Sequence, residues 1–117
     1  MKRFLAAGVF CLMAAAVAAH PHLEQAQPAA DSTAAGVGEL RLRFSEAVEP
    51  RLSTVRLETE EERTVTAPAA EPDAADPKVL VVRLYEKLAP GRYRVRWSVV
   101  AADGHKMTGA FTFLASR

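Results

Sequence analysis

Residues 92–99 carry the pattern that most constrains the fold of this chain. Apolar side chains stand at every second position, and the positions between them are polar or charged. The apolar set is Tyr93, Val95, Trp97 and Val99, and the polar set is Arg92, Arg94, Arg96 and Ser98. Because successive side chains of a β-strand point to opposite faces, we expect the first set to face a core and the second to face solvent.

Other short segments repeat this period of two. We expect strands over residues 38–44, 54–58, 64–66, 78–85 and 110–114, and a turn at 88–91. We expect an irregular, extended segment at 20–37 and a long loop at 67–77. No stretch has a sustained helical period, so the sequence predicts an all-β fold, a sandwich or small Greek-key barrel. The expected core is Leu40, Leu42, Phe44, Val55, Leu57, Tyr93, Val95, Trp97, Val99, Phe111 and Phe113.

Residues 1–19 have the features of a secretory signal peptide. The basic residues Lys2 and Arg3 precede an uncharged, apolar run that ends in small residues at Ala19. The run is too short to span a bilayer, and Cys11 does not follow a small residue as a lipoprotein cysteine would. We therefore expect cleavage after Ala19 and one mature domain over residues 20–117, without a membrane span.

Charge and cysteine content narrow the function classes. Removing Lys2 and Arg3 from 15 basic and 14 acidic residues leaves a formal charge of −1. That balance gives no reason to expect a nucleic-acid binder. Cys11 is the single cysteine and lies in the expected signal peptide, so the mature domain has neither disulfides nor thiolate metal ligands.

The expected cleavage makes His20 the first residue of the mature chain. Its free α-amine and its ring Nδ1 can then chelate one metal ion, a donor pair that exists only after processing. His22, in third position, could complete a square-planar site through deprotonated backbone amides, but Pro21 has no N–H to lose. The chelate of His20 therefore needs ligands from elsewhere in the chain. The ordinary alternative is that both histidines are merely solvated.

Asp103-Gly104-His105 could supply those ligands. In an extended segment, residues two apart point to the same side, and Gly104 allows a sharp turn. One amine, two imidazoles and one carboxylate would form an N3O set, which favours tetragonal Cu(II). Asp-Gly is also a common turn, and spacing alone does not bring it to His20. Glu46 follows an expected strand and could reach such a site or be a surface charge.

The row of arginines at positions 92, 94 and 96 has two interpretations. It forms a solvated strand face whose charges pair with carboxylates, or it docks an acidic partner.

Several segments in order along the chain resemble the CopC family of periplasmic copper-resistance proteins. They are His20-Pro21-His22-Leu23, Leu42-Arg43-Phe44-Ser45-Glu46, Leu88-Ala89-Pro90-Gly91, Tyr93-Arg94-Val95-Arg96-Trp97, Val99-Val100-Ala101-Ala102-Asp103-Gly104-His105 and Gly109-Ala110-Phe111-Thr112-Phe113. The resemblance covers nearly the whole mature chain. It implies a cupredoxin-like or immunoglobulin-like Greek-key barrel.

The resemblance also implies a function. The chain would be a periplasmic, non-enzymatic Cu(II) buffer or carrier that passes copper to an inner-membrane partner of the CopD type. His20, Asp103 and His105 match the family's Cu(II) ligands, Glu46 matches a glutamate near the metal, and the role of His22 stays open. Some family members have a methionine-rich Cu(I) loop, but residues 59–78 contain neither Met nor His. We therefore expect the form that binds Cu(II) only.

Two other functions remain possible on the residues. An N-terminal histidine with a second histidine is also the copper centre of lytic polysaccharide monooxygenases, which would make the chain an oxidative enzyme. Such enzymes need open copper positions and a broad substrate surface, whereas Asp103 would fill an equatorial position here. The third possibility is an immunoglobulin-like interaction module that binds no metal.

Overall fold

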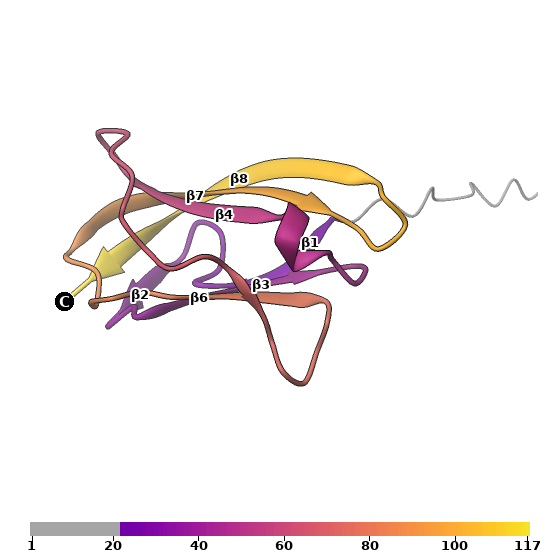
Figure 1. The fold of residues 1–117 in the computed structure, drawn as a ribbon. Helices are drawn as coiled ribbons and strands as arrows, with labels where there is room; N and C mark the ends of the chain where they lie inside the picture. The colour runs from indigo at the N-terminus through magenta and orange to yellow at the C-terminus, as the bar shows by residue number, and fades with distance from the viewer. Residues whose placement is uncertain (1–21) are drawn as a thin grey trace, which may run out of the picture.

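The computed structural model describes residues 22–117 as a sandwich of two four-stranded sheets (Figure 1). The expected signal peptide, His20 and Pro21 lie outside the described residues. The first sheet has the order β1-β3-β6-β5, and its neighbouring strands are all antiparallel. Its strands are β1 (Leu23–Gln27), β3 (Glu39–Phe44), β6 (Val79–Arg83) and β5 (Glu71–Pro72).

The second sheet has the order β2-β8-β7-β4 and contains the two longest strands. Its strands are β2 (Thr33–Ala35), β8 (Lys106–Ser116), β7 (Gly91–Val100) and β4 (Thr54–Thr59). β2 runs parallel to β8, and the other pairs are antiparallel. A short 3-10 helix, η1 (Pro50–Leu52), precedes β4. The structure thus confirms the predicted all-β sandwich.

The strand phases that place the core are confirmed. Of the eleven residues expected in the core, nine are buried, and Trp97 is only 9% exposed. Val55 and Phe111 are half-buried and pack against the core from its border, so their predicted full burial is wrong. Val55 lies on the edge strand β4, and the segment around Thr64 and Val65 pairs with that strand at Leu57 and Glu58 rather than at Val55.

Aromatic packing joins the two sheets around Trp97. The Trp97 ring meets Phe44 of the opposite sheet edge-on, with ring centroids 6.3 Å apart, and lies 5.9 Å from the ring of Phe111. Edge-on contacts are the preferred geometry of aromatic pairs. Gly109, opposite Trp97 on β8, leaves the space for this ring, because a Cβ there would come within 2.2 Å of it.

Three segments differ from the expectation. Residues 20–37 were expected to be irregular, but β1 and β2 lie there; a bulge between Leu23 and Gln25 breaks the alternation that would have revealed β1. The expected loop 67–77 contains the two-residue β5. The strand expected at 64–66 is only a single bridge, Glu58 opposite Thr64.

Candidate metal centre

The candidate ligands Asp103 and His105 lie in the turn that joins β7 to β8. The two strands pair from Gly91 to Val100, so the turn stands at the end of a long ladder. Within the turn, the Ala101 N–H donates to the His105 carbonyl at 2.8 Å, and the Gly104 N–H donates to the Ala101 carbonyl at 2.9 Å. Gly104 has a φ of +92°, which glycine adopts without steric cost. It therefore lets the chain reverse between the two candidate ligands.

The side chains of Asp103 and His105 contact each other directly. Asp103 Oδ1 accepts the His105 backbone N–H at 3.0 Å, and Oδ2 lies 2.7 Å from His105 Nδ1. The backbone hydrogen bond is the main reason that the pKa of Asp103 is lower than usual, and the side-chain bond to Asp103 is the main reason that the pKa of His105 is raised. Both side chains are about half exposed. The side chains thus lie together, although the segment is a turn and not the extended stretch considered in the sequence analysis.

The loop between β3 and η1 packs against this turn and brings Glu46 to it. Val48 bridges to Ala101, and the Ala102 N–H donates to the Ala47 carbonyl at 3.1 Å. Glu46 adds to the raised pKa of His105 through its negative charge, after the larger contribution of Asp103. Its Oε2 atom is buried and has no hydrogen-bond partner among residues 22–117. A buried carboxylate oxygen without a partner is costly, so a water, an ion or a group outside residues 22–117 that bonded to it would stabilise this end of the fold.

His22 enters the same end of the sandwich from the N-terminal side. Its backbone N–H donates to Ser45 Oγ at 3.0 Å, and the Ser45 N–H returns a hydrogen bond to the His22 carbonyl at 2.9 Å. Ser45 precedes Glu46, so the segment 45–47 lies between His22 and the 101–105 turn. Sequence analysis did not assign Ser45 this role, because a hydrogen bond across 23 residues leaves no local signal.

The arrangement can provide adjacent donors to a metal ion. Among residues 22–117, no three His, Cys, Asp or Glu side chains converge as a metal-binding group. The Asp103 Oδ2 and His105 Nδ1 atoms are, however, 2.7 Å apart. Two ligands at right angles, with bonds of about 2.0 Å, stand roughly 2.8 Å apart. The two atoms would therefore be able to bind one ion side by side, if that ion replaced the proton that they share.

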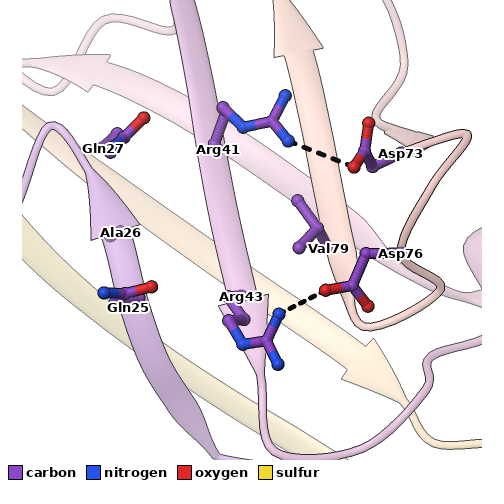
Figure 2. A pocket seen from close by; sticks show the side chains of 8 residues that line it. All are labelled: Gln25, Ala26, Gln27, Arg41, Arg43, Asp73, Asp76 and Val79. Carbon is purple, nitrogen blue, oxygen red and sulfur yellow. Dashed lines mark hydrogen bonds and ion pairs between the residues drawn. The ribbon is translucent and has the colours of Figure 1, made fainter.

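A separate hollow of about 230 Å³ lies on the outer face of the first sheet (Figure 2). Two ion pairs line it: Arg41 Nη2 lies 3.2 Å from Asp73 Oδ2, and Arg43 pairs with Asp76. Lys78 donates its backbone N–H to Asp76, and this bond is the largest cause of the lowered pKa of Asp76, with Arg43 adding to it. None of the candidate metal ligands lines this hollow.

The comparisons with known proteins agree with this fold. The family model of the CopC domain matches residues 23–116. Copper resistance protein C of Escherichia coli is 34% identical over 118 residues, which cover 96% of this chain and 94% of that protein. Protein YobA of Escherichia coli K12 is 36% identical over 103 residues, which cover 87% of this chain and 83% of YobA.

Solved structures show the same relationship. PcoC of Escherichia coli, described as a methionine-rich copper resistance protein, has a TM-score of 0.76 at 36% identity and covers 84% of this chain and 100% of its own. CopC of Methylosinus trichosporium OB3b has a TM-score of 0.76 at 31% identity and covers 83% of this chain and 94% of its own.

These relationships confirm the predicted family and agree with a copper-related, non-enzymatic protein. In the part of the chain that the structure describes, no helix is long and apolar enough to cross a membrane. The CopC model spans nearly all of the described residues, and relatives above 30% identity cover most of the chain. The chain belongs to the CopC family.

Proposed function

We propose that this protein binds Cu(II) after export and buffers or carries it, without catalysis. The ligands are the α-amine and ring of His20, together with Asp103 and His105. The observation that carries the proposal is the contact between Asp103 Oδ2 and His105 Nδ1, whose 2.7 Å spacing suits two adjacent ligands. Relatives named copper resistance protein C support copper as the cargo.

The fold supports a role for His20 because of where His22 lies. His22 is tied to Ser45, next to Glu46, whose negative charge acts on His105. Two residues of extended chain reach about 7 Å, so His20 can come close to the 101–105 turn. Cleavage after Ala19 would then give the site its amine, since before cleavage the same nitrogen belongs to a peptide bond.

Glu46 takes a supporting position in this proposal. Its buried Oε2 has no hydrogen-bond partner among the described residues and lies close enough for its charge to affect His105. We assign it to the surroundings of the ion or to a weak axial contact. His22 is held through its backbone by Ser45, and the role of its ring stays open.

The donor set selects Cu(II) over Cu(I). Oxygen and nitrogen donors suit Cu(II), whereas Cu(I) prefers thiolates and thioethers. Met107 is the single methionine after residue 19, and it packs against the hydrophobic core. Residues 59–78 contain no methionine, in contrast to the methionine-rich description of PcoC.

The family and the N-terminal sequence support a location for the protein and motivate a class of partner. The signal-peptide features of residues 1–19 and the CopC relationship support a periplasmic protein. The copper would pass to an inner-membrane protein of the CopD type.

Copper titration followed by electron paramagnetic resonance tests the site. The protein that begins at His20 should bind one Cu(II) with an N3O spectrum. A matched protein with one alanine added before His20 should bind Cu(II) orders of magnitude more weakly, because its His20 nitrogen is an amide. Affinity should also fall as pH decreases from about 8 to 5, since protons compete for the amine and the rings. Equal affinity of the two proteins would show that the amine is not a ligand.

Substitutions test the remaining donors. His105→Ala and Asp103→Ala should each weaken Cu(II) binding, and His22→Ala should be the mildest of the histidine changes. Retained affinity in both His105→Ala and Asp103→Ala would exclude the 101–105 turn from the site.

A further inference from the structure

The outer surface of the second sheet gathers positive charge. We call it the basic face and define it by the cations that β4, β7 and β8 point away from the core. These are Arg56, Arg92, Arg94, Arg96 and Lys106. All five residues are exposed. The domain from residue 20 onward has a formal charge of about −1. The gathering of positive charge on this face is therefore local, and does not reflect an excess of basic residues in the whole domain.

One cross-strand pair on this face works against stability of the sheet. Arg56 stands directly opposite Arg96 on the neighbouring strand, and like charges in such a pair are destabilising. Glu58 is the single carboxylate that the paired strands β4, β7 and β8 place on this face, and its Oε2 accepts from Arg96 Nε at 3.1 Å. Within the described chain, Arg56, Arg92 and Arg94 form no ion pair.

The outer face of the first sheet is built in the opposite way. Its arginines, Arg41, Arg43 and Arg83, all have carboxylate partners. Figure 2 shows two of these pairs, Arg41 with Asp73 and Arg43 with Asp76. The chain can therefore neutralise a row of strand arginines with its own acids, and on the basic face it does so for Arg96 alone. Glu60 and Glu62 border a hollow of about 140 Å³ with Arg92 and Arg94 but do not reach ion-pair distance.

We propose that the basic face docks the acidic surface of another protein. A guanidinium binds a carboxylate through two parallel hydrogen bonds, and the small residues Ala110 and Thr112, opposite Arg96 and Arg94, allow close approach. Lys106 directly follows His105, so the face begins beside the 101–105 turn, and a docked partner would border the candidate metal centre.

A protein surface fits the face better than a lipid membrane does. Surfaces that bind membranes combine cations with apolar side chains that enter the bilayer, often aromatic ones. The large exposed apolar residues of the described chain are Leu52, Tyr85 and Leu114. Of these three, Leu114 lies on a strand of this face, and it is the partner of Arg92 at the end away from the turn. The proposal goes beyond copper binding, since these charges are present whether or not the turn holds an ion.

Binding of metal-free protein to poly-L-glutamate, in the presence of a chelator, tests the proposal. The protein that begins at His20 should bind, and added salt should weaken the binding. Arg92→Gln/Arg94→Gln should reduce affinity by about tenfold because two charge-assisted contacts are lost. The matched control is Arg83→Gln/Lys87→Gln, which removes the same charge from exposed positions outside the basic face and should bind as the parent does.

Two results would overturn the docking face. In the first, the two double variants lose affinity for poly-L-glutamate equally, which would make binding a matter of net charge. In the second, the protein binds vesicles of phosphatidylglycerol and phosphatidylethanolamine, and Arg92→Gln/Arg94→Gln abolishes that binding, whereas the same variant binds poly-L-glutamate as the parent does. That result would make the face a lipid-binding surface. A Cu(II) titration of Arg92→Gln/Arg94→Gln should give the parent's stoichiometry, so a failed metal site and a failed docking face remain distinguishable.

Discussion

The core and the first sheet of the sandwich, here called the body, differ from the end that carries Asp103 and His105 in how completely their groups find partners. In the body, aromatic rings pack across the sheets and the arginines of the first sheet are paired with acids. At the other end, Asp103 and His105 contact each other while half exposed, and Glu46 Oε2 is buried without a hydrogen bond among the described residues. The body of the fold thus finds nearly all of its partners within the chain, whereas the other end leaves a buried carboxylate oxygen unpaired.

The difference separates stability from binding. A core substitution should lower the free energy of unfolding and leave the affinity of the folded molecules for Cu(II) unchanged. A substitution at the end that carries Asp103 and His105 should lower the affinity for Cu(II) and leave the free energy of unfolding unchanged. The body has one exception, since the buried Trp97 Nε1 also lacks a hydrogen-bond partner within residues 22–117. The packing of the Trp97 ring must therefore outweigh the cost of that unpaired N–H.

The largest expected effect is on the core side of the comparison. Trp97→Ala should lower the free energy of unfolding by about 3–5 kcal/mol, because it empties the space between Phe44 and Phe111. Urea denaturation measures the change. Trp97→Phe keeps an aromatic ring and removes the unpaired N–H, so it should cost clearly less. Equal losses in the two variants would mean that ring packing is not the source of stability here.

The next largest effect on stability should come from adding a side chain beside Trp97. Gly109→Ala puts a methyl group against the Trp97 ring, where the undisturbed distance would be 2.2 Å. Relief requires movement of the ring or of β8, and we expect a loss of about 1–3 kcal/mol in thermal or urea unfolding. Gly38→Ala is the matched control, because its nearest neighbour would be a lysine side chain at 3.9 Å. A Gly109→Ala protein as stable as the parent would show that the contact is easily relieved.

Glu46 tests the other side of the comparison. Glu46→Gln should leave the copper-free protein about as stable as the parent, within roughly 1 kcal/mol, because the buried Oε2 atom has no described hydrogen-bond partner to lose. Its Cu(II) affinity should fall by about 10- to 100-fold, as expected when a group beside a metal is altered. Unfolding of the copper-free protein and copper titration measure the two properties. A variant with reduced stability and unchanged affinity would place Glu46 in the body of the fold.

These regions also differ in how far the sequence predicts them. The alternation on β3 and β7 places Phe44 and Trp97 in the core correctly, because an uninterrupted strand imposes a period of two. Strand β1 stays hidden, since its bulge breaks that period. Val55 and Leu57 look equivalent in sequence and lie on the same edge strand, yet Leu57 is buried and Val55 is half-buried. The segment around Thr64 and Val65 pairs with β4 at Leu57 and Glu58, and this contact between separate segments leaves no signal in the alternation.

The candidate site is predictable only in part for a related reason. Asp103 and His105 are two residues apart, so their proximity is a local property of the turn. The approach of Glu46 depends on contacts of the Ala47–Val48 segment with Ala101 and Ala102, which join distant parts of the chain. Local spacing contains no information on such contacts. The missing partner of Glu46 Oε2 is likewise visible only after the loop is folded.

The smallest expected effect concerns the ion-paired surface of the body. The backbone N–H of Lys78, together with Arg43, keeps the pKa of Asp76 below its usual value of 3.8. A carboxyl group whose pKa is lower in the folded state stabilises the protein above its unfolded pKa, and this stabilisation is lost as pH falls through the folded value. Asp76→Asn should therefore flatten the dependence of unfolding on pH below about 4, and the difference from the parent should be largest at neutral pH. Glu86→Gln, at an exposed position away from these pairs, is the control. If both variants keep the parent's acid profile, Asp76 does not contribute to stability, and the ion-paired surface would be no more complete than the site end.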